Sequence, residues 1–139
     1  MKRLVLAVAA LLPLTLLASD PYVPTDAERA RWTMYDLQSW RTAFDAYKLD
    51  HKVYPTAKTP EEARAAVEPM YILHAPVADA WGHAYQIKSN GTGFRVISAG
   101  ADGTFQPESW SVGGRVSSFA GDAVATNEGR WLFRFWEMR

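Results

Sequence analysis

Residues 26–50 read DAERARWTMYDLQSWRTAFDAYKLD, and the spacing of their apolar residues decides the fold. Six of these residues recur three and four positions apart, as on one face of a helix: Ala30, Met34, Leu37, Trp40, Phe44 and Tyr47. Three more are expected to widen that face: Trp32, Tyr35 and Ala43. The pattern predicts one long helix over about 26–50 whose apolar face packs on the rest of the domain.

Two capping signals place the helices of the chain. Residues 25–28 (TDAE) form a capping box, in which Thr25 and Glu28 each accept a backbone N–H of the other, and this box precedes the long helix. Residues 59–62 (TPEE) form a second box with Pro60 at the first helical position. The second box predicts a short helix over 60–68 that ends at Pro69.

The C-terminal half of the sequence predicts antiparallel strands. Residues 85–88 and 94–97 flank Asn90-Gly91, a strong hairpin signal, although the extra Thr92-Gly93 favours a longer loop or a bulge. A second hairpin is expected from strands at 123–126 and 130–136. Between the hairpins lies a long loop over 99–121. The fold class is therefore α+β: a long N-terminal helix on a small antiparallel sheet, with a short helix in the connecting segment and a long C-terminal loop.

The first residues of the chain have the layout of an export signal. Lys2 and Arg3 precede an apolar run over 4–18, which is shorter than the roughly 20 residues of a membrane-spanning helix. We expect a signal peptide over 1–19 and one α+β domain over 20–139, located in the periplasm or otherwise exported. The alternative is that 1–19 stays as a short inner-membrane anchor, in which case the protein contacts the membrane through that segment alone.

The composition argues against several classes of function. The chain has no cysteine and equal numbers of basic and acidic residues, and no basic stripe suits a nucleic acid. The three histidines have no zinc-ligand spacing, and the sequence has neither a G-x-S-x-G elbow nor an H-E-x-x-H motif. We therefore expect a non-enzymatic protein that binds neither a nucleic acid nor a small-molecule substrate, which leaves other proteins as its expected partners.

Four motifs occur in one order along the chain, within residues 43–50, 54–56, 79–86 and 94–103. They read A-x-x-x-Y-x-x-D, Y-P-T, D-x-W-G-x-x-Y and S-x-G-x-D-G. This order resembles the C-terminal domain of the major pseudopilin of type II secretion, the protein G family, over about residues 27–126. The resemblance implies a pseudopilin-like fold and a non-catalytic, periplasmic, structural and interaction role in protein transport, with other type II secretion components as partners.

The start of the chain differs from the pattern of that family. A pseudopilin has a cleavage site before Phe and a Glu at the fifth mature position, and neither is present here. Pro21 and Pro24 also separate the apolar run from the predicted long helix. An alternative function stays open, namely a free-standing exported calcium-binding or assembly module unrelated to secretion.

The segment SAGADG, residues 98–103, carries the candidate binding site. The resemblance implies that the loop after this motif binds calcium, and Ca²⁺ prefers carboxylate and carbonyl oxygens. The predicted ligands are Asp102, the backbone carbonyl of Ala99, and Asp122, with Glu108 as a further candidate inside the loop. The alternative is a plain turn, since Asp-Gly is a common turn pair.

The motif around Trp81 is expected to be structural. We expect Asp79 to cap backbone amides of its turn, Trp81 to pack on the long helix, and Gly82 to adopt a left-handed conformation.

Overall fold

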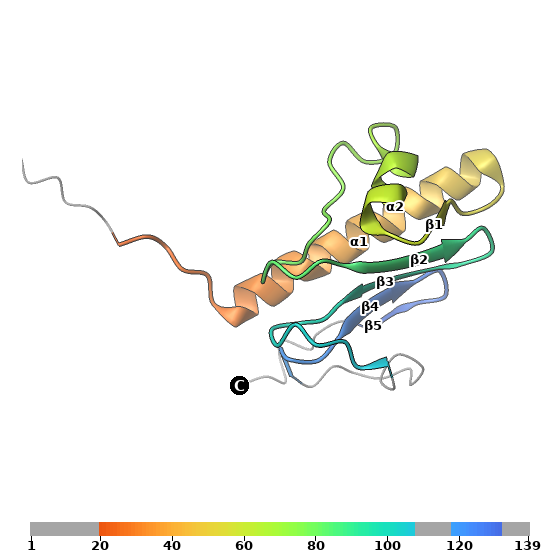
Figure 1. The fold of residues 1–139 in the computed structure, drawn as a ribbon. Helices are drawn as coiled ribbons and strands as arrows, with labels where there is room; N and C mark the ends of the chain where they lie inside the picture. The colour runs from red at the N-terminus through yellow and green to blue at the C-terminus, as the bar shows by residue number, and fades with distance from the viewer. Residues whose placement is uncertain (1–19, 108–117, 132–139) are drawn as a thin grey trace, which may run out of the picture.

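The computed structural model describes residues 20–107 and 118–131, which form one long helix on an antiparallel sheet (Figure 1). The elements follow in the order α1 (Asp26–His51), β1 (Thr56–Ala57), α2 (Pro60–Val67), β2 (Gln86–Asn90), β3 (Phe94–Ser98), β4 (Ala123–Thr126) and β5 (Arg130–Trp131). This arrangement confirms the α+β prediction. The predicted leader at 1–19, the strand residues beyond Trp131, and Glu108 lie outside the described residues.

The five strands lie in the sheet in the same order as in the chain, and each pairs antiparallel with its neighbour. The register places Ile87 opposite Val96, and Val96 opposite Ala125. All three side chains are buried in the core beneath α1. Alternate residues point to the other face, where Lys88 and Arg95 lie directly opposite each other and are exposed.

Helix α1 begins and ends as its sequence predicts. The hydroxyl of Thr25 accepts a hydrogen bond from the Glu28 N–H, and the Glu28 carboxylate accepts one from the Thr25 N–H, which completes the capping box. At the other end Lys52 adopts a left-handed conformation with φ of 66° and donates its N–H to the carbonyl of Lys48.

The core forms where α1 crosses the sheet. Leu37, Trp40 and Phe44 are fully buried. The ring of Phe44 lies 5.5 Å from Trp40 and 4.8 Å from Phe94 between centroids, in tilted and edge-to-face arrangements that aromatic pairs favour. The indole N–H of Trp40 donates to the Pro76 carbonyl at 2.9 Å, so this large side chain is buried without an unpaired donor.

The predicted apolar face of α1 is too wide. Trp32 and Tyr35 were expected to extend it, but they are 43% and 62% exposed. Thr33 is buried instead, because its hydroxyl accepts the Ala80 N–H at 3.2 Å from the segment that covers this part of the helix. Tyr47 is half-buried, and its ring lies 5.5 Å from that of Tyr71 between centroids.

The connecting segment also differs in detail from the sequence prediction. Helix α2 begins at its capping residue Thr59, as expected, but ends at Val67 because the next residue, Glu68, is extended before a proline. Strand β1 was not predicted, since it has two residues and no alternating pattern of its own. Within residues 20–107 and 118–131, no helix is long and apolar enough to span a membrane.

The β2–β3 turn is the longer loop rather than a two-residue type I′ turn. In a type I′ turn both central residues have positive φ, but of Asn90 and Gly91 only Gly91 does, with φ of 88°. The Asn90 carboxamide oxygen accepts the N–H groups of Thr92 and Gly93, and thereby closes the loop.

Candidate functional site: the SAGADG loop

The turn at residues 79–83, to which the candidate site is attached, is held by several hydrogen bonds. Asp79 is buried, and its Oδ1 accepts the N–H groups of Trp81 at 3.1 Å and His83 at 2.9 Å. Gly82 has φ of 89°. The Trp81 indole donates to Asp26 at 2.9 Å, at the start of α1. All three structural predictions for this motif are confirmed.

The first residue of the SAGADG loop is tied to the same aspartate. The hydroxyl of Ser98 donates to Asp79 Oδ2 at 2.6 Å and accepts the Gly100 N–H at 3.1 Å. Ser98 and Asp79 are both buried, so these bonds form away from water, where a hydrogen bond to a carboxylate is strong. The loop therefore leaves β3 in a defined direction.

Gly100 is the point at which the two ends of the long loop over 99–121 meet. Its φ is 67°, and a Cβ built on it would lie 2.5 Å from the Gly121 carbonyl oxygen, 2.7 Å from that of Phe119 and 3.0 Å from that of Ala120. The next residue, Ala101, donates its N–H to Phe119 at 2.7 Å. Only a residue without a side chain fits this close backbone approach.

Both candidate carboxylates contact one short segment of the loop. Asp102 is exposed, and its Oδ1 accepts the Thr104 N–H at 2.9 Å, as in an Asx turn. Asp122 is buried, and its Oδ2 accepts the Gln106 N–H at 2.7 Å. The Gln106 side chain reaches the other oxygen of Asp102 at 3.4 Å. Asp102 and Asp122 are 20 residues apart in the sequence, and each accepts a backbone N–H from residues 104–106.

The predicted ligands are of a type that suits a hard cation. Carboxylate and backbone carbonyl oxygens are the ligands that Ca²⁺ prefers, and the third predicted ligand, Ala99, is buried between Ser98 and Gly100. Across residues 20–107 and 118–131, no three His, Cys, Asp or Glu side chains gather at a metal-binding distance. A calcium ion here would therefore take the carboxylates of Asp102 and Asp122, and carbonyl or water oxygens for the rest of its shell.

Sequence reasoning missed a half-buried acid that contacts Tyr85. Asp36 was not among the residues expected on the packed face of the long helix, yet its Oδ2 accepts the hydroxyl of Tyr85 at 2.9 Å. Burial raises the pKa of Asp36 and the nearby charge of Asp79 raises it further, while the Tyr85 hydrogen bond opposes the shift. Burial also raises the pKa of Tyr85, with the Asp36 charge as the second cause. The position of Asp36 four residues before Trp40, on the same side of the helix, could have signalled its burial.

The raised pKa of Asp36 predicts a pH-dependent stability. An acid whose pKa is higher in the folded state favours folding when protonated, so its contribution is present below its ordinary pKa and is lost as the pH rises through the folded pKa. We expect Asp36→Asn to gain stability relative to the wild type between pH 4 and pH 7, as measured by urea denaturation. Asp20→Asn, at an exposed position, is the matched control and should leave the pH profile unchanged. Parallel profiles for wild type and Asp36→Asn would contradict the expectation.

A long helix on an antiparallel meander, followed by a loop built on S-x-G-x-D-G, is the arrangement expected for the globular domain of a pseudopilin. A family model described as type II secretion system protein G matches residues 23–110. The chain belongs to this family. The match includes α1, α2, β1 to β3 and Asp102, whereas β4, β5 and Asp122 lie beyond it. Among curated proteins, no relative matches the chain.

Proposed function

We propose that this protein is a non-catalytic, periplasmic structural and interaction domain that acts in type II protein secretion. The observation that carries the proposal is the family match over 23–110, which covers the whole of α1 and the first three strands. Its partners on this proposal are other components of the secretion system.

The bonding of the titratable groups supports a structural role. Asp79 accepts three hydrogen bonds from its own turn and from Ser98, and Asp36 accepts the hydroxyl of Tyr85. His83 lies against the carbonyl of Gly100. Each of these groups links one element of the fold to another.

The absence of cysteine from the sequence gives a direct test of the proposed partners. Single cysteines at the exposed positions Tyr35 and Met70 can be cross-linked in the producing cell without background from native thiols. We expect cross-links to type II secretion components, and we expect deletion of the gene to reduce the secretion of exported proteins. Unchanged secretion together with no cross-link to these components would favour the free-standing exported module instead.

We further propose that Asp102, Asp122 and the carbonyl of Ala99 bind calcium and thereby hold the long loop against the sheet. Two contacts support this site: both carboxylates accept N–H groups from residues 104–106, and the carbonyls of residues 119–121 lie close to Gly100. The chain has no cysteine for a disulfide, so an ion would add to the hydrogen bonds from Ala101 to Phe119 and from Gln106 to Asp122 that join the two ends of the loop.

Calcium is expected to raise the melting temperature of the wild-type protein. If the ion binds only the folded chain, the gain is about 2.7 kcal/mol at one hundred times the dissociation constant. Asp102→Ala should abolish the gain, Asp20→Ala should leave it intact, and magnesium should substitute poorly because it demands a tighter octahedral shell. The titration should extend to millimolar calcium. No shift in melting temperature and no heat in calorimetry would mean that SAGADG is only a turn.

A further inference from the structure

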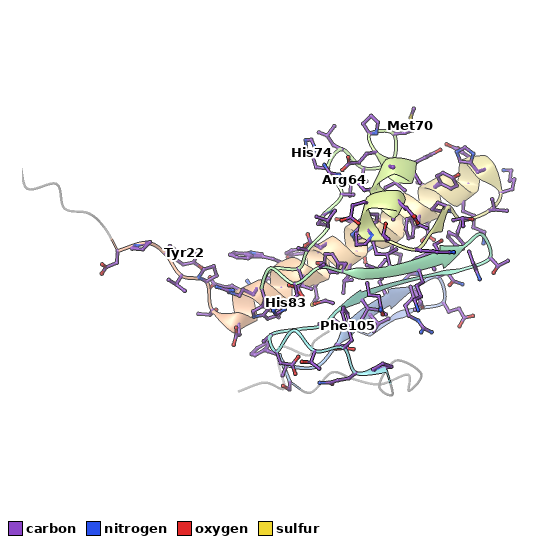
Figure 2. All side chains as sticks on the ribbon, in the orientation of Figure 1. Tyr22, Arg64, Met70, His74, His83 and Phe105 are labelled. Carbon is purple, nitrogen blue, oxygen red and sulfur yellow. The ribbon has the colours of Figure 1, made fainter. Side chains whose placement is uncertain are left out.

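His83 lies beside the SAGADG loop although it belongs to a different part of the chain. Figure 2 shows it at the end of the sheet where the loop leaves β3, close to the first half of α1. Its Nδ1 is 2.9 Å from the carbonyl oxygen of Gly100. A carbonyl oxygen only accepts, so Nδ1 carries the proton and donates it to Gly100. The side chain is thereby fixed in one tautomer and one orientation.

Four residues form a closed ring of hydrogen bonds at this point. The His83 N–H donates to Asp79, and the His83 side chain donates to the Gly100 carbonyl. The Gly100 N–H donates to Ser98, whose hydroxyl donates to the other oxygen of Asp79. Both backbone polar groups of Gly100 are therefore hydrogen-bonded: the N–H to Ser98 at the start of the loop, and the carbonyl to His83 outside it.

The imidazole of His83 also lies against Gly103, the last residue of the SAGADG motif. A Cβ built on Gly103 would lie 2.8 Å from Nε2 of His83 and 3.0 Å from Cδ2 and Cε1. The backbone at Gly103 thus passes directly against the imidazole, with φ of 69°. His83 contacts the loop at residues 100 and 103, on both sides of Asp102.

We propose that His83 is a positioning residue for calcium binding: it holds the SAGADG loop at Gly100 and Gly103 so that Asp102 and the Ala99 carbonyl are placed before the ion arrives. This inference rests on the calcium site proposed above. Residues that orient metal ligands without touching the metal typically change metal affinity 10- to 100-fold when they are removed.

The experiment measures calcium affinity by calorimetry well below the melting temperature, so that only folded protein is titrated. We expect His83→Ala to weaken calcium binding 10- to 100-fold. His83→Asn should restore most of the affinity, because its side-chain amide nitrogen can occupy the place of Nδ1 and donate to Gly100. Val67→Ala, which creates a cavity in α2 away from the loop, is the control for lost stability and should leave the affinity unchanged.

A double-mutant cycle tests the second contact. Gly103→Ala should weaken calcium binding strongly in the wild type, because the new methyl group meets the imidazole. The same change should have a smaller effect in His83→Ala, since the imidazole is gone while the strain of a positive φ is the same in both backgrounds.

The outcomes separate this inference from the calcium site itself. Wild-type protein that binds no calcium in the millimolar range overturns both proposals. Wild-type binding with equal affinity in His83→Ala overturns the role of His83 alone. Failure of His83→Asn to recover affinity, together with an additive cycle, would also overturn it.

Discussion

Phe44→Ala is expected to lower the free energy of unfolding by about 3–5 kcal/mol. Phe44 is fully buried, and its ring contacts Trp40 from the same helix and Phe94 from the sheet. Removing it leaves a cavity at the contact between the two layers and breaks two aromatic pairs. Urea denaturation followed by tryptophan fluorescence measures the loss, and a midpoint near that of the wild type would show that α1 does not bury this face.

Tyr35→Ala provides the matched control on the same helix. Tyr35 is also aromatic, but it is 62% exposed, and its backbone carbonyl accepts a hydrogen bond from the Ser39 hydroxyl. Surface substitutions of this kind usually change stability by no more than about 0.5 kcal/mol. A large loss at Tyr35 would mean that this position is covered in the protein as it exists in solution.

Gly100→Ala is expected to cost about 2–5 kcal/mol. A left-handed conformation costs a residue with a Cβ roughly 1–2 kcal/mol, and forcing extra atoms into a packed site typically adds 1–3 kcal/mol. At Gly100 both terms apply, because the new methyl group would lie 2.5–3.0 Å from three backbone carbonyl oxygens that cannot rotate away. The loop at residues 118–121 would have to move.

Substitutions at two other glycines allow the conformational cost and the steric cost to be measured separately. Gly82→Ala meets no atom within 4 Å but has φ of 89°, so it should show the conformational cost alone. Gly129→Ala also meets nothing, and its φ is outside the left-handed region, so it should be close to neutral. Thermal unfolding of the three variants without added calcium gives the comparison. A cost at Gly100 no greater than at Gly82 would contradict the close approach.

The sequence was sufficient to predict the elements that depend on local signals. The boundaries of α1 follow from a capping box and a helical period, and both signals lie in the helix or in Thr25 directly before it. The width of its buried face does not follow, because that depends on what covers the helix. Residues 76–80 bury Thr33 and leave Trp32 exposed, and no local pattern in α1 contains that information.

The same distinction applies to the candidate site. The capping role of Asp79 was predictable because its partners lie within four residues. The contact of His83 with Gly100 spans 17 residues and requires the 79–83 turn to meet the end of β3, so no local pattern predicts it. The bond of Asp36 to Tyr85 was missed because it spans 49 residues, although the place of Asp36 four residues before Trp40 was a local sign that it is partly covered.

The strands lie in the sheet in the same order as in the chain, and this has a consequence for how the protein folds. Strands β2 and β3 are joined by a short turn, as are β4 and β5, so each hairpin forms at a low entropic cost of closure. Pairing β3 with β4 requires the ends of the long segment from 99 to 122 to come together. This pairing also brings the carbonyls of residues 119–121 close to Gly100. Topology of this kind favours early formation of the first hairpin with α1, and late docking of the second. The SAGADG loop would then be among the last parts to form during folding, and among the first to open when the native state fluctuates.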